Sequence, residues 1–145
     1  MVRKYEAKDL VYVMEIWLDT NKKAHSFIPS TYWLSSYDMV QEQIAQAKLY
    51  VYEDKETHQI IGFIGLVEEH IAGLFVKEGF QAKGVGKQLL DYVKQEYTKL
   101  FLQVYQKNKR AIAFYEREQF HIQSESVDEN TQEKEWLMYW EKNNL

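Results

Sequence analysis

The sequence predicts an α/β (α+β) fold, with a mixed, mainly antiparallel central sheet of about seven strands flanked by about four helices. Short apolar segments alternate with segments whose apolar residues recur at helical spacing. Strand-like segments follow one another closely between residues 49 and 76, as in an antiparallel meander. Residues 70–105 then form a strand–helix–strand unit, which should cross over right-handed and leave its two strands parallel.

The first third of the chain is expected to hold a short strand followed by helices. Residues 2–5 are strand-like, and Asp9 is placed to cap or begin a helix. That helix should be amphipathic, with an apolar face made of Leu10, Val13, Met14 and Trp17. Residues 20–37 include the chain's only proline and show no clear period, so we expect a helix end, a loop and a short helix there. A further helix is expected around residues 39–47.

The central segment changes to strand periodicity. Residues 49–52 and 59–67 have strand character, and a tight connection at Glu68 and Glu69 leads to a third strand at residues 70–76. A loop at residues 77–83 precedes a helix whose buried face should consist of Val85, Leu89, Leu90, Val93 and Tyr97. These segments supply the meander and the crossover helix.

The last third predicts one more helix between strands. Residues 100–105 form an apolar strand, and Asn108 can cap a helix at residues 109–118. Residues 120–126 and 135–140 read as the final strands, joined by a polar turn. No repeat, low-complexity tract or linker interrupts the pattern, so residues 1–145 are expected to form a single domain.

Composition excludes several classes of function. The chain contains 46% hydrophobic and 28% charged residues, and its formal charge of −4 argues against general binding to nucleic acid. It has no cysteine, which excludes disulfides, thiolate metal sites and a cysteine nucleophile. The four histidines are dispersed, so no metal is expected. No signal peptide or membrane-length apolar run is visible, so we expect a cytoplasmic protein without a membrane partner.

The sharpest signal is the segment from Gln81 to Lys87, Gln-Ala-Lys-Gly-Val-Gly-Lys, between an apolar strand and an amphipathic helix. Gly84 and Gly86 lack Cβ atoms, so the backbone can turn and a ligand can approach it closely. The first turn of the helix offers unpaired amide N–H groups and the positive end of the helix dipole. These features suit a pyrophosphate, although the same pattern also fits a plain strand-to-helix turn. The P-loop and dinucleotide fingerprints are both missing.

At this motif the chain resembles the GNAT superfamily of N-acetyltransferases. The family's pyrophosphate motif, Gln/Arg-x-x-Gly-x-Gly/Ala, is matched by Gln81, Gly84 and Gly86. Residues 71–76 resemble the family's fourth strand, and residues 108–115 resemble its second signature, Asn-x-x-Ala-x-x-Phe-Tyr. The order of elements agrees along nearly the whole chain. The resemblance implies the acyl-CoA N-acyltransferase fold, acetyl-CoA as cosubstrate and an amine as acceptor.

The resemblance also implies where the cofactor is held. Backbone amides would bind the pyrophosphate in the loop and first helical turn, at Gln81, Ala82, Lys83, Gly84, Val85, Gly86 and Lys87. Main-chain groups of Leu74 and Val76 would pair with the pantetheine arm like an added strand. An N–H near Leu74 or Phe75 would polarise the thioester carbonyl. Asn108 would contact the cofactor, cap its helix, or do both.

Two side chains are predicted to move protons. By resemblance, Tyr115 donates a proton to the departing thiolate, with a buried structural tyrosine as the alternative. His70 stands where histone-acetylating relatives carry a glutamate base and an arylalkylamine-acetylating relative carries a histidine. An imidazole suits proton removal near neutral pH, and Glu68, Glu69 or a water chain are the alternatives.

The acceptor site is expected in the least regular part of the chain. The residues predicted to shape it are His25, Phe27, Tyr32 and Trp33. Tyr32 and Trp33 can stack on a cationic amine or pack in the core. The predicted function is transfer of the acetyl group from acetyl-CoA to a primary amine of a small molecule, by direct attack in a ternary complex. Acetylation of a protein lysine or N-terminus is one alternative, and a non-catalytic acyl-CoA-binding sensor is another. A monomer and a homodimer remain equally open.

Overall fold

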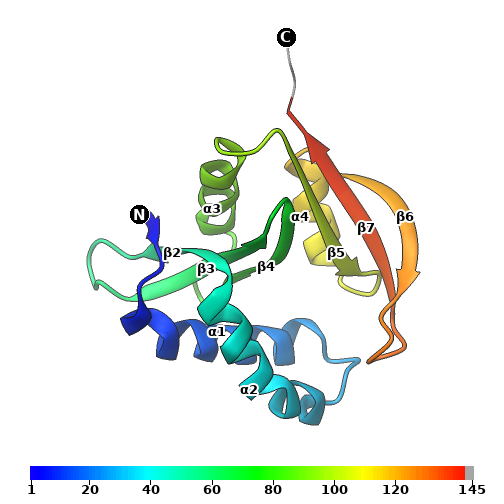
Figure 1. The fold of residues 1–145 in the computed structure, drawn as a ribbon, viewed down its shortest axis with the longest axis horizontal. Helices are drawn as coiled ribbons and strands as arrows, with labels where there is room; N and C mark the ends of the chain where they lie inside the picture. The colour runs from blue at the N-terminus through cyan, green and yellow to red at the C-terminus, as the bar shows by residue number, and fades with distance from the viewer. Residues whose placement is uncertain (143–145) are drawn as a thin grey trace.

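A computed structural model describes residues 1–142, in which seven strands form one mixed sheet (Figure 1). The strands are β1 (Val2–Lys4), β2 (Lys48–Glu53), β3 (Ile60–Val67), β4 (His70–Val76), β5 (Lys99–Tyr105), β6 (His121–Val127) and β7 (Lys134–Glu141). The helices are η1 (Ala7–Asp9), α1 (Leu10–Ala24), α2 (Ser30–Gln46), α3 (Val85–Lys94) and α4 (Lys109–Arg117). The strand order is β1-β2-β3-β4-β5-β7-β6, and the predicted fold class is confirmed.

β4 and β5 are the only parallel neighbours in the described sheet, as the crossover predicted. They pair over just two positions, His70 with Phe101 and Ile71 with Leu102. On the other side of β4, the register with β3 shifts between Gly65 and Leu66, which leaves Ala72 as an extra residue. Such a β-bulge bends its strand and increases its twist. β4 therefore turns away from β5 after Ile71.

Each face of the sheet carries its own core. Leu49 and Val51 in β2 point to one side, where α1 and α2 pack, while Tyr50 points to the other, where α3 and α4 pack. The buried face of α3 includes four of the five predicted residues, Val85, Leu89, Leu90 and Val93. The fifth, Tyr97, follows the end of the helix and is only partly buried.

The expectation for residues 20–37 is right about the helix end and the loop and wrong about a separate short helix. α1 continues to Ala24, and α2 runs without a break from Ser30 to Gln46, so only residues 25–29 are not helical. The face of α2 toward α1 consists of Trp33, Tyr37, Val40 and Ile44. Trp17 of α1 meets Trp33 and Tyr37 with ring centroids 6.0 and 6.3 Å apart. This helical period was hidden in the sequence because exposed Leu34 and Met39 interrupt it.

Gly62 in β3 lets α3 and β4 pack closely. A Cβ atom there would lie 3.0 Å from the carbonyl oxygen of Phe75 and 3.1 Å from Cγ1 of Val85. At Gly65, three residues along, a Cβ atom would lie 3.0 Å from the end of the Leu49 side chain, which can move.

We therefore expect Gly62→Ala to lower the free energy of unfolding by about 1–3 kcal/mol, because the backbone of β4 must shift. Urea denaturation measures the change, with Gly65→Ala as the matched control. Equal losses in the two variants would show that close packing at Gly62 is not a special constraint.

Candidate active site

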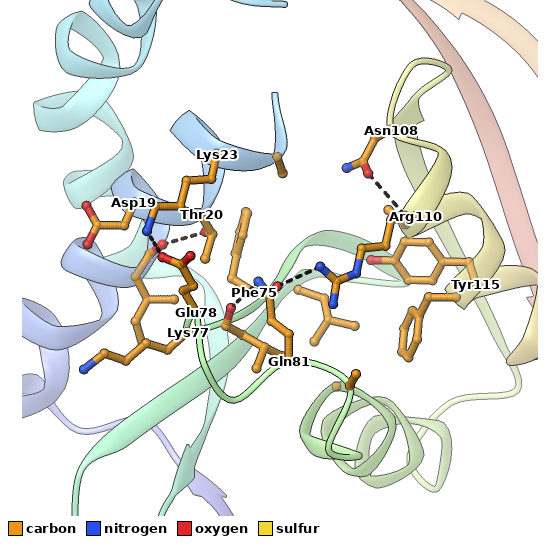
Figure 2. Close-up of a pocket in the computed structure, with 18 of the residues that line it drawn as sticks. Asp19, Thr20, Lys23, Phe75, Lys77, Glu78, Gln81, Asn108, Arg110 and Tyr115 are labelled. Atoms are coloured by element: carbon orange, nitrogen blue, oxygen red, sulfur yellow. Dashed lines mark hydrogen bonds and ion pairs between the residues drawn. The ribbon is translucent and has the colours of Figure 1, made fainter. Parts of the chain in front are cut away.

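A cavity of about 1080 Å³ lies where β4 and β5 diverge (Figure 2). Its walls come from α1, from the end of β4 and the following loop, from the start of α3, and from α4. Eleven of the residues predicted to bind cofactor, carry out catalysis or bind the acceptor line it, namely His25, Leu74, Phe75, Val76, Gln81, Ala82, Gly84, Gly86, Lys87, Asn108 and Tyr115. The volume is at the upper end of what ligand pockets usually offer, about 300–1000 Å³.

The glycine turn at the start of α3 has the geometry of an anion site. Gly84 is the N-cap of α3 and adopts a left-handed conformation with φ of +82°. The amides of the first helical turn have no partner within the helix, and the helix dipole adds positive potential there. At Gly86 a Cβ atom would lie 3.4 Å from the Phe114 ring, in ordinary van der Waals contact, so the helix start packs closely on α4. Lys83 and Val85, by contrast, do not line the cavity.

Side chains tie the walls of the cavity together. Gln81 donates from Nε2 to the carbonyl oxygen of Val76 at 3.0 Å and accepts from Nη1 of Arg110 at 3.0 Å. The end of β4 is thereby linked to α4. On the opposite side Lys23 of α1 forms an ion pair with Glu78 in the loop after β4 (Figure 2).

Tyr115 brings a phenol to the cavity from α4. Its ring is 8% exposed and lies between Phe114 and Phe120, with centroids 5.3 and 5.5 Å away. The hydroxyl points into the cavity (Figure 2). Burial raises the pKa of the phenol above its ordinary value, so Tyr115 keeps its proton near neutral pH and can serve as a general acid but not as a general base.

His25 bridges α1 and α4 across the cavity. Its Nε2 lies 3.1 Å from Nδ2 of Asn108 and its Nδ1 lies 3.1 Å from Oδ1 of Asn21. Because the amide nitrogen donates, Nε2 accepts, and the ring proton belongs on Nδ1. Burial lowers the pKa of His25 to about 4, which keeps the ring neutral. Oδ1 of Asn108 accepts from the amide of Ala111 at 3.2 Å, so the predicted helix cap is confirmed.

Other predicted site residues lie outside the lining of the cavity. His70 is half-buried at the start of β4, and burial lowers its pKa. Phe27, Tyr32 and Trp33 form an aromatic cluster with His25 and do not line the cavity either. Their roles toward an acceptor stay predictions, as does proton removal by His70.

One wall of the cavity went unnoticed in the sequence. α1 contributes Tyr12, Glu15, Ile16, Asp19, Thr20 and Lys23. Most of these side chains are exposed, and their spacing resembles an ordinary solvent face, so no local signal marked them. Phe114 and Arg110 also line the cavity. Both belong to the second signature at residues 108–115, so the sequence did contain a signal that could have identified them.

The structure also bears on metal binding and on membrane spanning. Within residues 1–142, no group of three or more histidine, aspartate or glutamate side chains is arranged to hold a metal ion. Over the same residues, no helix combines the length and apolar character needed to cross a membrane.

Diverging parallel strands, a helix start with unpaired amides and a protonated phenol meet in one cavity, an arrangement that suits an acyl-CoA thioester. The Acetyltransferase (GNAT) family matches residues 10–120, and the chain belongs to this family. The predictions of an acyltransferase and of acetyl-CoA as its cosubstrate are confirmed.

The chain is similar to several bacterial proteins. Peptidyl-lysine N-acetyltransferase YiaC of Escherichia coli (strain K12) is 34% identical over 142 residues, covering 97% of this chain and 96% of YiaC. The solution structure of apo YjaB from Escherichia coli shares 23% identity with a TM-score of 0.86, covering 99% of this chain and 98% of YjaB. An aminoglycoside 6'-N-acetyltransferase complexed with coenzyme A shares 13% identity with a TM-score of 0.74, covering 97% and 96%. The YjaB structure and the aminoglycoside acetyltransferase structure have the same fold as this chain.

The partly buried, neutral His25 predicts a pH dependence of stability. The pKa is about 4 in the folded protein against an ordinary 6.5, so the unfolded chain binds more protons between these values. The free energy of unfolding should therefore fall as pH drops through this window, and His25→Gln should remove part of the slope. Chemical denaturation from pH 7 to 4 measures it. His58→Gln, at an exposed histidine, serves as the control, and equal slopes in all three proteins would contradict the assignment.

Proposed function

We propose that this enzyme acetylates the ε-amine of lysine residues in proteins. The observation that carries the proposal is the similarity to YiaC, which is named a peptidyl-lysine N-acetyltransferase and matches over nearly the full length of both chains. YjaB, with which this chain shares 27% identity over 124 residues, has the same description. The small-molecule acceptor and the cytoplasmic location expected from the sequence stay predictions.

Acetyl-CoA supplies the acetyl group as a thioester. The amides of the first turn of α3, from Gly84 onward, are proposed to hold the pyrophosphate, and Arg110 supplies positive charge on the α4 wall. Leu74 and Val76 are proposed to pair their main-chain groups with the pantetheine arm. Lys87 suits phosphate binding less well than its position in the motif suggests, because its ammonium lies 3.1 Å from Glu118 and 3.3 Å from Asp91.

Proton transfer is proposed to involve Tyr115 and His70. Tyr115 remains protonated at neutral pH because its pKa is raised, so its hydroxyl can donate to the departing thiolate. His70 remains neutral because its pKa is lowered, so its ring can accept a proton from the ammonium of the acceptor. His70 opens β4 at the point where β4 still pairs with β5, four residues before Leu74. Glu68, Glu69 and water remain the alternative bases.

The acceptor class can be tested directly. The enzyme should transfer acetyl groups to lysine side chains of peptides whose N-termini are blocked, which mass spectrometry of the products detects. Peptides with a free N-terminus and no lysine, and a panel of polyamines and aminoglycosides, provide the comparison. Acetylation of the small amines alone would support the small-molecule acceptor instead. Tight acetyl-CoA binding without acetylation of any acceptor would support the non-catalytic acyl-CoA-binding sensor.

We expect Tyr115→Phe to lower turnover by about ten- to a thousandfold, because the leaving thiolate loses its proton donor. The affinity for acetyl-CoA should change by less than about tenfold, since the proton matters mainly in the transition state. Steady-state kinetics with the best peptide measures turnover, and calorimetry measures binding. Phe114→Leu, which alters the adjacent ring, controls for packing. Full activity of the phenylalanine variant would make Tyr115 a structural residue.

A further inference from the structure

One face of the β5–β7–β6 half of the sheet is open except at its last row, where Tyr105 packs on the α1–α2 loop. Its first row crosses the sheet through Phe101, Tyr139 and His121, which the register places opposite one another. Its last row crosses through Tyr105, Glu135 and Ser126. None of these six residues is buried, whereas Leu100, Leu102 and Met138 on the other face are fully covered. We call the open face the platform.

The platform leads to the predicted reaction centre. Phe101 lies opposite His70 in the short parallel pairing, so the first row continues onto β4 where the two strands begin to diverge. At its other end the last row lies beside the α1–α2 loop, where Tyr105 meets His25 and Phe27 with ring centroids 4.9 and 5.7 Å apart. In Figure 1 that loop runs close to the turn between β6 and β7. The last row therefore adjoins the cavity at His25, which lines it.

The end of the platform near that turn carries negative charge without a cation. Within residues 1–142, neither Glu135 nor Asp128 forms an ion pair. Asp128 accepts hydrogen bonds from the Tyr105 hydroxyl at 2.6 Å and from the amide of Asn130 at 2.9 Å. Burial and the nearby Asp128 raise the pKa of Glu135, as expected for a carboxylate that lacks a positive partner.

The two lysines near the ends of β5 do not pair with these carboxylates. Lys99 lies opposite Glu141 across β5 and β7, and Lys107 pairs with Glu133 at 3.0 Å. The unmatched carboxylates thus complement a basic side chain, and the rings of Tyr105 and Tyr32, which flank them, can stack on its cation.

We propose that the platform docks an extended segment of the acceptor protein, with the reacting lysine beside His70 and Phe101 and a second basic side chain beside Glu135. This inference rests on the proposed function. Glu135 and Tyr139 are four residues apart along β7, which corresponds to about 13 Å at strand spacing. An extended substrate should therefore carry its second basic residue about four positions from the reacting lysine.

The test compares peptides that contain one lysine and blocked termini. One series carries arginine four positions before or after the lysine, and the matched series carries glutamate there. Wild type should prefer one arginine peptide by about five- to tenfold in kcat/KM. Glu135→Gln should reduce that preference to less than about twofold by raising KM for the arginine peptide, with kcat unchanged.

Glu125→Gln is the matched control, because it removes the same charge from β6 at a side chain that already pairs with Lys134 at 3.6 Å. Glu125 lies opposite Trp136, which packs on the α3–α4 side, so it belongs to the other face. This variant should keep the preference.

Failure of the inference and failure of the proposed function are distinguishable. If wild type acetylates no lysine peptide, the proposed function fails and the docking proposal falls with it. If it acetylates all peptides equally, or if Glu125→Gln loses the preference as Glu135→Gln does, only the platform is overturned. Size-exclusion chromatography adds a further outcome, since a dimer that Glu135→Gln dissociates would assign the platform to a second copy of the chain and overturn the proposal.

Discussion

The brief pairing of β4 with β5 is the constraint on which the rest of the site depends. Backbone N–H and C=O groups need partners, and β4 loses those on β5 after Ile71. The side chain of Gln81 serves one of them, the carbonyl of Val76. The backbone groups of β4 between Ile71 and Val76 face the cavity. There the amides of an extended cofactor arm can complete the interrupted ladder of hydrogen bonds. The extra residue at Ala72 produces the divergence, so a single β-bulge creates both the cavity and its unpaired strand edge.

The opposite wall is held by buried contacts. Glu118, at the end of α4, is 8% exposed, and its carboxylate accepts from Lys87 of α3 at 3.1 Å. Its backbone carbonyl accepts from Lys94 at 2.6 Å. Because Tyr115 stands one helical turn before Glu118, the contacts that join α3 to α4 also help to position the phenol. The Glu118 carboxylate is nearly buried although the Lys87 side chain is 58% exposed, so loss of its partners should cost more than loss of a surface ion pair.

Local patterns predicted most of the strands, the buried face of α3, the glycine turn and the cap at Asn108, because each depends on neighbouring residues. The sequence could not place contacts that join distant segments. His25 meets Asn108 across 83 residues, and the α1 wall consists of side chains that look like a solvent face until the loop after β4 folds against them. α2 was misread because its apolar stripe is interrupted by exposed Leu34 and Met39, which only the packing against α1 distinguishes from core residues.

The two sides of the cavity therefore differ in rigidity. The α3–α4 side relies on a buried carboxylate, whereas α1 is joined to the loop after β4 by Lys23 and Glu78, two exposed side chains whose pairing stabilises little. Across the cavity, α1 reaches α4 through the neutral hydrogen bond from Asn108 to His25, which a polar ligand atom can replace at small net cost. The more rigid α3–α4 side suits a cofactor that is the same in every turnover. An adjustable wall beside the open sheet face suits acceptor lysines that differ in the residues around them.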